Sequence, residues 1–358
     1  MKNYKADFPI FKNYPGLAYF DSAATSQKPQ VVIDSIVDFY LFKNANVHRG
    51  IYPLSELATL AYEQARKEVA EFLEVDSREI IFTSGSTAGA NMIAQSYLAA
   101  NLTAGDIIIS SVAEHHSNFL PLQRVASTTN STVKLINLNT DFELDYEMLD
   151  DLLKANTNKI KALAFSAVSN VLGIRLNLER IVKLTRKYSP QAKIIIDGAQ
   201  IVGHHNISLK DLDIDFFFFS GHKIFAATGI GVLWAKEGLL AAMSPYQLGG
   251  GMIEKVTEIN STFTEIPERF EAGTPNIEGA ISLGAAVKYI ANIGIKNIEN
   301  KLAELSSLLK IELETIPNCK IYGSTTNSSQ SDIFSFSIDI HPHDIAQFLG
   351  ERQVCVRA

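Results

Sequence analysis

The stretch Phe216-Phe217-Phe218-Phe219-Ser220-Gly221-His222-Lys223 joins four consecutive phenylalanines to a short polar turn. A second apolar run, at residues 194–196, is followed in the same way by Asp197-Gly198-Ala199-Gln200. Apolar runs of this length are typical of strands buried on both faces of a parallel sheet. Because ligands bind beyond the carboxyl ends of strands in open α/β sheets, both turns are candidate site segments.

The same alternation extends along most of the chain, where apolar runs of strand length alternate with longer stretches of helical periodicity. This pattern predicts an α/β fold with a large, mainly parallel seven-stranded sheet covered by helices. The expected strands lie at residues 79–83, 106–111, 134–138, 160–167, 192–196, 215–220 and 231–235. The expected helices lie at residues 30–42, 54–72, 87–101, 118–126, 146–154, 177–188, 277–293 and 297–316.

A change of pattern near residue 277 predicts a second, smaller α+β domain. Two helices are followed there by short strands at 320–322 and 332–340, a helix near 344–350 and a last strand at 354–357. A length of 358 residues also fits about two domains. We therefore expect a large α/β domain at 19–287 and a small domain formed by 1–18 and 288–358. Residues 254–268 are expected to form an extended loop.

The composition is that of an ordinary folded protein, with 46% hydrophobic and 20% charged residues. Lys and Arg total 32 against 39 Asp and Glu, a formal charge of −7, so nucleic acid and anionic membranes are not expected partners. No apolar stretch approaches the length of a membrane span or a signal-peptide core. The two cysteines, Cys319 and Cys355, form no CxxC pair and fit a reducing compartment, which predicts a cytoplasmic protein.

Polar residues follow five of the expected strands, at the edge where parallel strands end. They are Ser84-Gly85-Ser86-Thr87-Ala88-Gly89, Glu114-His115-His116, Ser169-Asn170, Asp197-Gly198-Ala199-Gln200 and Ser220-Gly221-His222-Lys223. The amides of the first turn can hold a phosphate, although small residues also suit any tight turn before a helix. The sequence has no P-loop and no GxSxG pattern, and its adjacent histidines lack HExxH spacing, so a catalytic metal is not expected.

Lys223 is notable because it follows a very apolar strand. Desolvation disfavours a charged ammonium, lowers its pKa and makes the amine nucleophilic, so that it can form a Schiff base with an aldehyde. For a single lysine, the alternative is a side chain that simply reaches water. Asp197 favours the chemical interpretation, because an acid for a pyridinium nitrogen, a Schiff-base lysine and a phosphate turn are the minimum that pyridoxal phosphate chemistry needs.

Seven strings resemble those of the SUF-type cysteine desulfurases, which belong to the class V aminotransferase family of pyridoxal phosphate enzymes, and they occur in that family's order. They are Phe20-Asp21-Ser22-Ala23-Ala24, Asn46-Val47-His48-Arg49-Gly50, Glu114-His115-His116-Ser117-Asn118, Ser169-Asn170-Val171-Leu172-Gly173, Asp197-Gly198-Ala199-Gln200, Ser220-Gly221-His222-Lys223 and Arg269-Phe270-Glu271-Ala272-Gly273-Thr274-Pro275-Asn276. The resemblance implies a fold-type I pyridoxal phosphate transferase. It also implies conversion of L-cysteine to L-alanine, with sulfur passed through an acceptor protein to iron–sulfur cluster assembly.

Carried over residue by residue, the resemblance implies that Lys223 forms the Schiff base and moves the substrate Cα proton. His115 would stack on the cofactor ring and exchange protons, Asp197 would pair with the ring nitrogen, and Gln200 with the phenolate oxygen. The implied phosphate ligands are Ser86, Thr87, Ser220 and His222, with Thr274 supplied by the other subunit of a homodimer. The implied substrate pocket comprises Ala23, Ala24, His48, Asn170 and Arg357. Ala88 replaces the family's glutamate in the phosphate turn.

The end of the chain differs from the family pattern. In the family, the segment matching residues 354–357 is followed by Thr-Gly-His-His-Cys-Ala, whose cysteine attacks the substrate sulfur, whereas this chain ends at Ala358. We expect either a shortened sequence or the loss of the sulfur-transfer step. Cys355 would share a strand face with Arg357, but a small buried hydrophobic residue is the simpler interpretation, and Cys319 lies at an expected turn.

Three functions stay open at this point. The first is the desulfurase reaction on L-cysteine. The second keeps the cofactor but acts as a selenocysteine lyase, on L-selenocysteine, or catalyses another class V reaction. The third is a catalytically inactive fragment that binds a partner.

Overall fold

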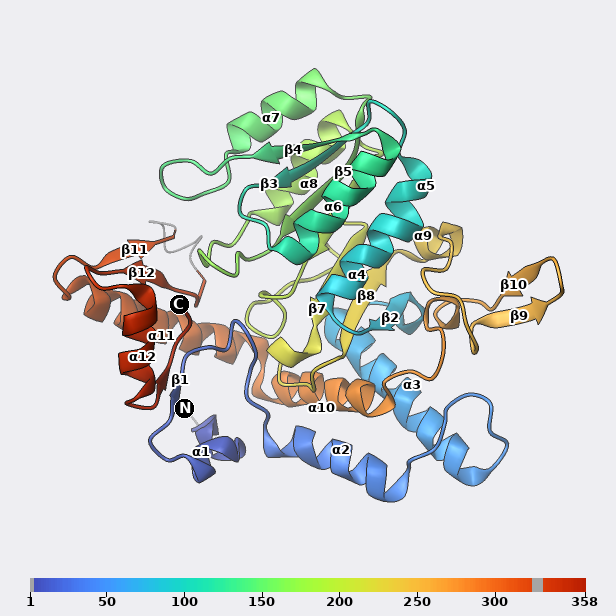
Figure 1. Cartoon of the computed structure of the whole chain (residues 1–358), viewed down its shortest axis with the longest axis horizontal. Helices are drawn as coiled ribbons and strands as arrows, with labels where there is room; N and C mark the ends of the chain where they lie inside the picture. Colours follow the sequence, from blue (N-terminus) through green and yellow to red (C-terminus); the bar gives the residue numbers. More distant parts are fainter. Residues whose placement is uncertain (1–2, 324–330) are drawn as a thin grey trace.

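The computed structural model describes residues 3–323 and 331–358, and its centre is a seven-stranded sheet in the order β2-β8-β7-β6-β5-β3-β4 (Figure 1). The strands are β2 (Ile80–Thr83), β3 (Ile107–Ser111), β4 (Thr132–Ile136), β5 (Ile160–Ser166), β6 (Lys193–Asp197), β7 (Phe216–Ser220) and β8 (Gly231–Ala235). All seven share one direction except β8, which is antiparallel to both β2 and β7. The predicted α/β fold with a mainly parallel seven-stranded sheet is confirmed.

Helices cover both faces of this sheet (Figure 1). Those whose side chains join the core on one face are α2 (Gln30–Phe42), α3 (Pro53–Leu73), α7 (Tyr146–Ala155), α8 (Leu178–Tyr188) and α10 (Ile277–Ile293). Those on the other face are α4 (Ser86–Met92), α5 (Ala99–Asn101), α6 (His116–Thr129) and α9 (Glu237–Ala242). A stretch of π-helix at Ile93–Leu98 joins α4 to α5.

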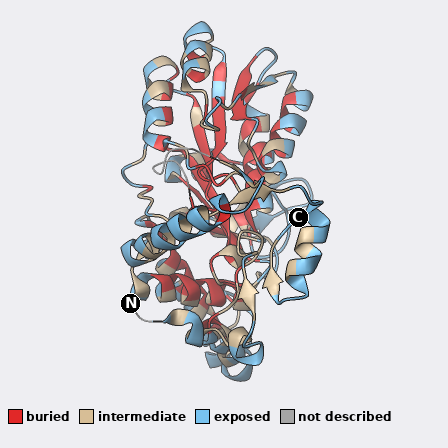
Figure 2. Ribbon diagram, turned by 90° about the vertical axis from the view of Figure 1, so that its left-hand side faces the viewer, coloured by how far each residue is buried: buried red, intermediate tan, exposed pale blue. Residues whose placement is uncertain are grey.

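Strand β7 shows why the sheet needs both helical layers. Successive side chains of a strand point to opposite faces, and accordingly Phe217 and Phe219 belong to the core under α3 and α10, whereas Phe216 and Phe218 belong to the core under α4 and α6. All four rings are fully buried, and each contributes about 1.5–3 kcal/mol relative to an exposed ring. Figure 2 shows the same buried centre along the central strands of the sheet, with the exposed residues on the outer sides of the helices.

Short polar side chains fix where several helices begin. Asp145 accepts a hydrogen bond from the Met148 amide at the start of α7, and Asn177 accepts one from the Arg180 amide at the start of α8. Asn276 does the same for the Gly279 amide of α10. Each such cap satisfies a backbone donor that the helix leaves unpaired and contributes about 1 kcal/mol.

The ends of the chain lie together (Figure 1). Strand β1 (Ala18–Tyr19) pairs in parallel with β13 (Val354–Cys355). The other elements here are α1 (Ile10–Asn13), α11 (Ile295–Glu314), α12 (Pro342–Gly350) and the antiparallel pair β11 (Lys320–Tyr322) and β12 (Ser335–Ser337). We propose that these segments form the small domain; helix α10 continues through the predicted boundary at 287/288 to Ile293.

Two local expectations were wrong. Strand β4 covers residues 132–136 and not 134–138, because it lies at the edge of the sheet and only Ile136 of its residues is buried, which weakens the apolar signal. The expected extended loop at 254–268 contains an antiparallel hairpin, β9 (Ile253–Val256) and β10 (Ser261–Phe263), which projects from the body of the molecule (Figure 1). Its polar, exposed residues carry no apolar pattern.

Candidate active site

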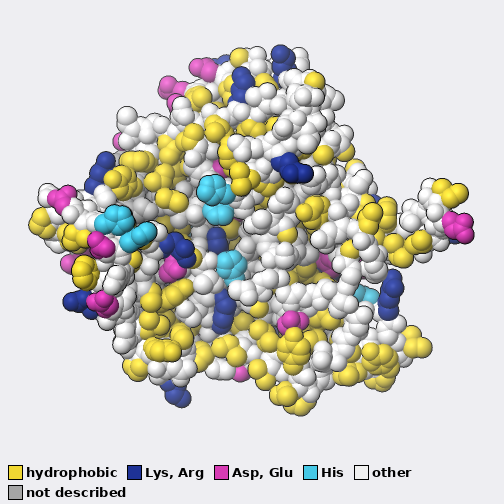
Figure 3. Space-filling model, in the orientation of Figure 1, with side chains coloured by type: hydrophobic (Ala, Val, Ile, Leu, Met, Phe, Trp, Pro, Cys, Tyr) yellow, Lys and Arg dark blue, Asp and Glu magenta, His cyan; other side chains and the backbone are white. Residues whose placement is uncertain are grey.

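The carboxyl ends of β2, β3, β5, β6 and β7 meet at one edge of the sheet, because these strands run in the same direction. Asp197 is the last residue of β6, and Lys223 ends the helical turn Gly221–Lys223 that directly follows β7. The structure thus brings together the two residues on which the sequence argument depends. On the face shown in Figure 3, histidine side chains gather with lysine and arginine near the middle of the molecule.

Lys223 has an unusual electrostatic environment. Burial lowers the pKa of its amine, and the negative charge of Asp197 only partly opposes this effect. A lowered pKa increases the share of the neutral amine, the form that can attack an aldehyde or accept a proton. The turn that carries Lys223 is held by the Gly221 amide, which donates to the Ile230 carbonyl over 2.9 Å.

Asp197 is a buried carboxylate, 4% exposed, that accepts a hydrogen bond of 2.8 Å from the Ala199 amide. Burial raises its pKa to about 6, and the charge of Glu114 adds to the rise, while the Ala199 amide and Lys223 act against it. The side chain therefore remains mostly ionised at neutral pH but is short of positive partners. It is suited to hold a cationic ring nitrogen.

The turn after β2 contacts the end of β7. The Ser86 amide and the Ser86 hydroxyl each lie 2.8 Å from Ser220 Oγ, and both serines are buried. Gly85 has φ of +147°, and a Cβ on Gly231 would lie 2.5 Å from Gly85 Cα. Glycine at both positions is what allows the turn to approach the sheet so closely. Thr87 is exposed at the next position.

The N-terminal segment 21–28 forms another wall of the site. Gln200 Nε2 donates a 2.9 Å hydrogen bond to the carbonyl of Ala23. The carbonyl of His222, next to Lys223, accepts hydrogen bonds from the amide and hydroxyl of Ser26, both 2.9 Å, and from Lys28 Nζ at 3.1 Å. The segment is therefore fastened to the turn that presents Lys223.

His115 is the N-cap of α6 and lies beyond β3. Its Nδ1 accepts a 3.1 Å hydrogen bond from the Ser117 amide and lies 2.7 Å from Ser117 Oγ. Partial burial lowers the pKa of the imidazole, and the charges of Lys223 and His116 lower it further. Burial, Lys223 and Lys28 act in the same way on His222. Both rings are therefore held toward the neutral form.

Two charged residues of this region were not predicted as site residues. Glu114 accepts hydrogen bonds from Ser111 Oγ, Ser166 Oγ and Asn118 Nδ2, at 2.7–2.8 Å, and burial raises its pKa. Burial lowers the pKa of Lys28 to about 8. In the sequence, Glu114 belongs to the string that includes His115, whereas Lys28 lies outside the quoted strings and had no signal of its own.

Other predicted site residues lie elsewhere. His48 and Thr274 both line a cavity of about 500 Å³ whose walls come from residues 46–49, the 250–253 segment and the loop 271–275. Arg357 is exposed and forms an ion pair with Asp21, with 3.0 Å from Nε to Oδ1 and from Nη2 to Oδ2. Asn170 lies half-buried in the loop after β5, and the amide of Ala24 donates to the Asp21 carbonyl.

The cysteines are both free and partly buried. Cys355 lies on β13 opposite Tyr19 of β1, and its carbonyl accepts the Phe20 amide over 2.9 Å, so it neighbours the segment that leads to Ala23. Cys319 lies in the turn before β11. Among residues 3–323 and 331–358, no helix has the length and apolarity needed to span a membrane, and no three His, Cys, Asp or Glu side chains cluster as metal ligands would.

These residues fit the demands of pyridoxal phosphate. A buried carboxylate, a desolvated lysine and two serine hydroxyls beside a glycine turn provide groups for its ring nitrogen, aldehyde and phosphate, respectively. The donor set therefore supports the cofactor that the sequence predicted.

Comparison with known proteins agrees with this chemistry. The model of the family described as "Aminotransferase class-V" matches residues 18–358. A probable cysteine desulfurase of Staphylococcus epidermidis is 42% identical over 357 residues, covering 98% of this chain and 85% of the relative. A cysteine desulfurase of Escherichia coli is 40% identical over 359 residues, covering 99% and 86%.

The fold is shared with a solved structure as well. The apo cysteine desulfurase of Thermococcus onnurineus is 36% identical, with a TM-score of 0.91, and the alignment covers 99% of this chain and 86% of that one. The identity over nearly the full chain and the geometry of Lys223 and Asp197 lead to one conclusion. The chain belongs to the class V aminotransferase family and is a pyridoxal phosphate-dependent enzyme of the cysteine desulfurase type.

Proposed function

We propose that the protein removes sulfur from L-cysteine, yielding L-alanine, and that it does so with pyridoxal phosphate held at the carboxyl edge of the sheet. The observation that carries the proposal is the pairing of Lys223, whose pKa is lowered by burial, with the buried carboxylate Asp197. The cysteine desulfurases at about 40% identity support the choice of substrate.

The residues of the site have distinct tasks in this proposal. Pyridoxal phosphate, when bound, supplies an electron-withdrawing ring that stabilises negative charge at the substrate Cα. Lys223 Nζ would hold the cofactor aldehyde before substrate enters and would then accept the substrate Cα proton, because its lowered pKa increases the share of neutral amine. Asp197 keeps the ring nitrogen protonated, and Gln200, already fixed by its bond to Ala23, donates to the phenolate oxygen.

The phosphate is assigned to the turn after β2 and to the end of β7. Ser86 and Ser220 supply hydroxyls, while Thr87 and His222 lie at the adjoining positions of the same two segments. His115, held at the start of α6 and with its pKa lowered, would stack on the ring and exchange protons there. Ala23, Ala24 and Asn170 line the substrate pocket, and Arg357 binds the substrate carboxylate in exchange for part of its contact with Asp21.

We further propose a homodimer in which Thr274 and His48 serve the partner's site. Both residues line the 500 Å³ cavity, and no contact described in residues 3–323 and 331–358 joins them to Lys223. Helices α2 and α3 and the loop between them expose large apolar side chains, which a second subunit would cover. They include Val37, Tyr40, Leu41, Phe42, Ile51, Leu54, Leu57 and Leu60.

The sulfur step needs a thiol. Overall, L-cysteine and a thiol RSH give L-alanine and RS–SH: the Cβ–S bond breaks, an S–S bond forms, and the thiol proton replaces sulfur on the product. The thiolate attacks the substrate sulfur, so the acceptor must reach the pocket. Cys355 is the nearer candidate within this chain, because β13 pairs with the strand that leads to Ala23; an acceptor protein for iron–sulfur cluster assembly is the expected final recipient.

The alternative substrate is L-selenocysteine, which the same groups would bind, since none of them contacts sulfur specifically. We also propose a cytoplasmic location, on the ground that Cys319 and Cys355 are free thiols. The catalytic test distinguishes L-cysteine from L-selenocysteine as substrate by the product released and by the rate with each.

The decisive experiment measures alanine release from L-cysteine by the purified protein with pyridoxal phosphate and a reducing thiol. Lys223→Ala is expected to abolish both alanine formation and the visible absorption of bound cofactor. Cys355→Ala, compared with Cys319→Ala, tests whether the chain supplies its own acceptor. A wild-type protein that binds cofactor but releases selenium from selenocysteine and no alanine from cysteine would contradict the desulfurase proposal.

A further inference from the structure

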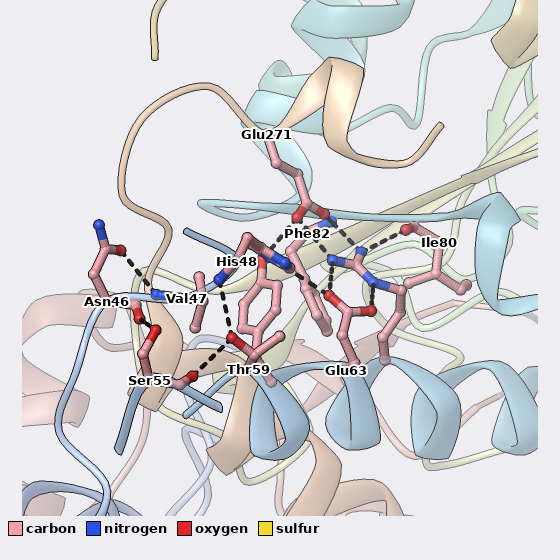
Figure 4. Close-up of polar contacts among 11 residues, drawn as sticks. Asn46, Val47, His48, Ser55, Thr59, Glu63, Ile80, Phe82 and Glu271 are labelled. Atoms are coloured by element: carbon pink, nitrogen blue, oxygen red, sulfur yellow. Dashed lines mark hydrogen bonds and ion pairs between the residues drawn. The ribbon is translucent and has the colours of Figure 1, made fainter. Parts of the chain in front are cut away.

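A charged cluster is buried between α3 and strand β2 of the sheet (Figure 4). Its centre is Arg66 of α3, whose side chain is 2% exposed, and Glu271, whose side chain is 6% exposed. The two are 205 residues apart in the chain and form a two-pronged pair, with 2.7 Å from Nη1 to Oε1 and 2.8 Å from Nη2 to Oε2. The tasks assigned above do not use either residue.

Every oxygen of the Glu271 carboxylate is doubly engaged. Besides Arg66, Oε1 accepts the Phe82 amide at 2.7 Å and Oε2 accepts the Tyr62 hydroxyl at 2.7 Å. Burying an ion pair is costly unless the remaining hydrogen-bonding capacity is satisfied, and here it is. So complete a set of contacts fixes the backbone at Glu271, three residues before Thr274.

The pair also closes the open edge of the sheet. Strand β2 is at the end of the sheet and pairs only with β8, so its outer amides and carbonyls need other partners. Arg66 Nη1 donates to the Ile80 carbonyl at 2.8 Å, while Glu271 accepts from the Phe82 amide. Arg66 and Glu271 thereby act as a substitute neighbouring strand for β2, which leads after Thr83 directly into the turn containing Ser86 and Thr87.

A further link runs to the other wall of the 500 Å³ cavity. Arg66 Nε contacts Glu63 Oε2 at 3.0 Å, and Glu63 Oε1 lies 3.7 Å from His48 Nε2. The backbone of His48 is held separately, by its amide donating to Thr59 Oγ1 at 2.9 Å, and its φ is +69°. The cluster therefore contacts the loop that bears His48 and the loop that bears Thr274, as well as strand β2.

We propose that Arg66 and Glu271 are positioning residues for the cofactor phosphate: they hold the Ser86 turn and the Thr274 loop in one fixed relation. This inference rests on the proposed function, in which the Ser86 turn binds the phosphate in its own subunit and Thr274 binds the phosphate of the partner's site. Each of the two ion pairs in the dimer then acts on both sites, through the Ser86 turn in its own subunit and through the Thr274 loop in the partner's site. In this proposal both residues act through these two segments and not as ligands of the phosphate.

The test compares two ligands that share the aldehyde but differ in the phosphate: pyridoxal phosphate and pyridoxal. Dissociation constants for both are measured by visible absorbance titration of the cofactor-free protein, with light scattering to confirm that each variant keeps the wild-type oligomeric state. Glu271→Gln is expected to weaken pyridoxal phosphate at least tenfold and pyridoxal less than twofold. Glu271→Asp, which keeps the charge, should recover part of the difference.

Two more variants test whether a change in cofactor affinity results only from a general loss of stability. Tyr62→Phe removes one of the four hydrogen bonds to Glu271 and should weaken pyridoxal phosphate two- to fivefold with pyridoxal unchanged. Arg186→Met breaks another partly buried ion pair, with Asp215 at 2.8 Å, at the start of β7, where Asp215 also accepts the Ile194 amide of β6. It should lower thermal stability without changing the ratio of the two affinities.

The ratio of the affinities for pyridoxal phosphate and pyridoxal decides whether Arg66 and Glu271 act on the phosphate site. Equal loss of pyridoxal phosphate and pyridoxal in Glu271→Gln and Tyr62→Phe, or no loss in either variant, overturns the positioning role. A wild-type protein that shows no preference for pyridoxal phosphate over pyridoxal instead contradicts the phosphate site of the proposed function. The two failures are thus distinguishable.

Discussion

The hydroxyl oxygens of Ser86 and Ser220 lie 2.8 Å apart, and Ser220 Oγ also accepts the backbone amide of Ser86. Ser86 follows β2 and Ser220 ends β7, two strands separated in the sheet by β8. The contact passes beyond the first residue of β8, Gly231, whose missing side chain makes the approach feasible. Two segments 134 residues apart in the chain are thereby fixed as one group of phosphate donors.

Ser220→Ala should therefore weaken cofactor binding by more than the loss of one hydroxyl ligand of the phosphate would. The substitution removes one hydroxyl from the phosphate and also leaves the Ser86 amide without its acceptor. A neutral hydrogen bond contributes about 0.5–1.5 kcal/mol, so two such losses predict roughly a 5- to 150-fold higher dissociation constant for pyridoxal phosphate. Absorbance titration measures it.

The matched control for that prediction is Ser110→Ala. Ser110 is fully buried on β3, and its hydroxyl donates to the Ala164 carbonyl at 2.9 Å, away from the turn. The variant should lose a comparable amount of stability, about 1 kcal/mol, with cofactor affinity unchanged. Equal cofactor loss in both variants would show that Ser220 matters only for stability.

Lys28 predicts a pH dependence in the alkaline range. Burial lowers its pKa from 10.5 to about 8 in the folded protein. A base whose folded pKa lies below its unfolded value opposes folding while it is charged in both states, below about pH 8. This penalty disappears as the pH rises toward 10.5.

In the cofactor-free protein, the stability difference between wild type and Lys28→Met should shift in favour of the wild type between pH 8 and 10, as measured by urea unfolding. A constant difference would contradict the prediction.

The sequence predicted the large sheet well because its strands are apolar enough to stand out. Helices α2 and α10 begin and end at the predicted residues, and Asp197 and Lys223 follow the apolar runs 194–196 and 216–219 of two central strands. Strand direction then brings those ends together without further information. The nature of the site was thus readable from local pattern plus one rule of topology.

The parts that the sequence did not predict depend on pairing between distant segments. Nothing near Arg66 in the chain signals that it meets Glu271, and helical periodicity alone would place a charged residue of α3 in solvent. The position of His48 and Thr274 in a cavity apart from Lys223 likewise follows from how α3 and the loop after β10 pack. The hairpin of β9 and β10 has no apolar alternation, because neither of its faces is buried.

Glu114 should matter for the placement of His115. Its carboxylate joins the ends of β3 and β5 to the first turn of α6 through Ser111, Ser166 and Asn118. A glutamine has one oxygen in place of two, so Glu114→Gln leaves at least one donor poorly paired and should cost about 1–2 kcal/mol of stability. The visible absorption band of bound cofactor should also shift, because His115 begins that helix.

The control is Asp145→Ala, which removes a comparable cap from α7, remote from His115. It should lower stability by about 1 kcal/mol and leave the absorption band in place. An unshifted band in Glu114→Gln, recorded beside this control, would limit Glu114 to a purely structural role.

Asp197 is expected to trade stability for function. Burial raises its pKa from 3.8 to about 6, so the folded protein binds this proton more tightly than the unfolded chain does. The ionised carboxylate therefore opposes folding above about pH 6, and the penalty falls away as the pH drops toward 3.8. The difference corresponds to about 2–3 kcal/mol.

Asp197→Asn, whose amide oxygen can still accept from Ala199, should stabilise the cofactor-free protein at pH 7–8 by part of that amount and should add little near pH 4. The same substitution removes the partner of the ring nitrogen, so alanine release should fall at least 100-fold. Urea unfolding at both pH values, together with the activity assay, checks the two halves; a variant that is less stable at pH 8 than the wild type would refute the proposed electrostatic strain.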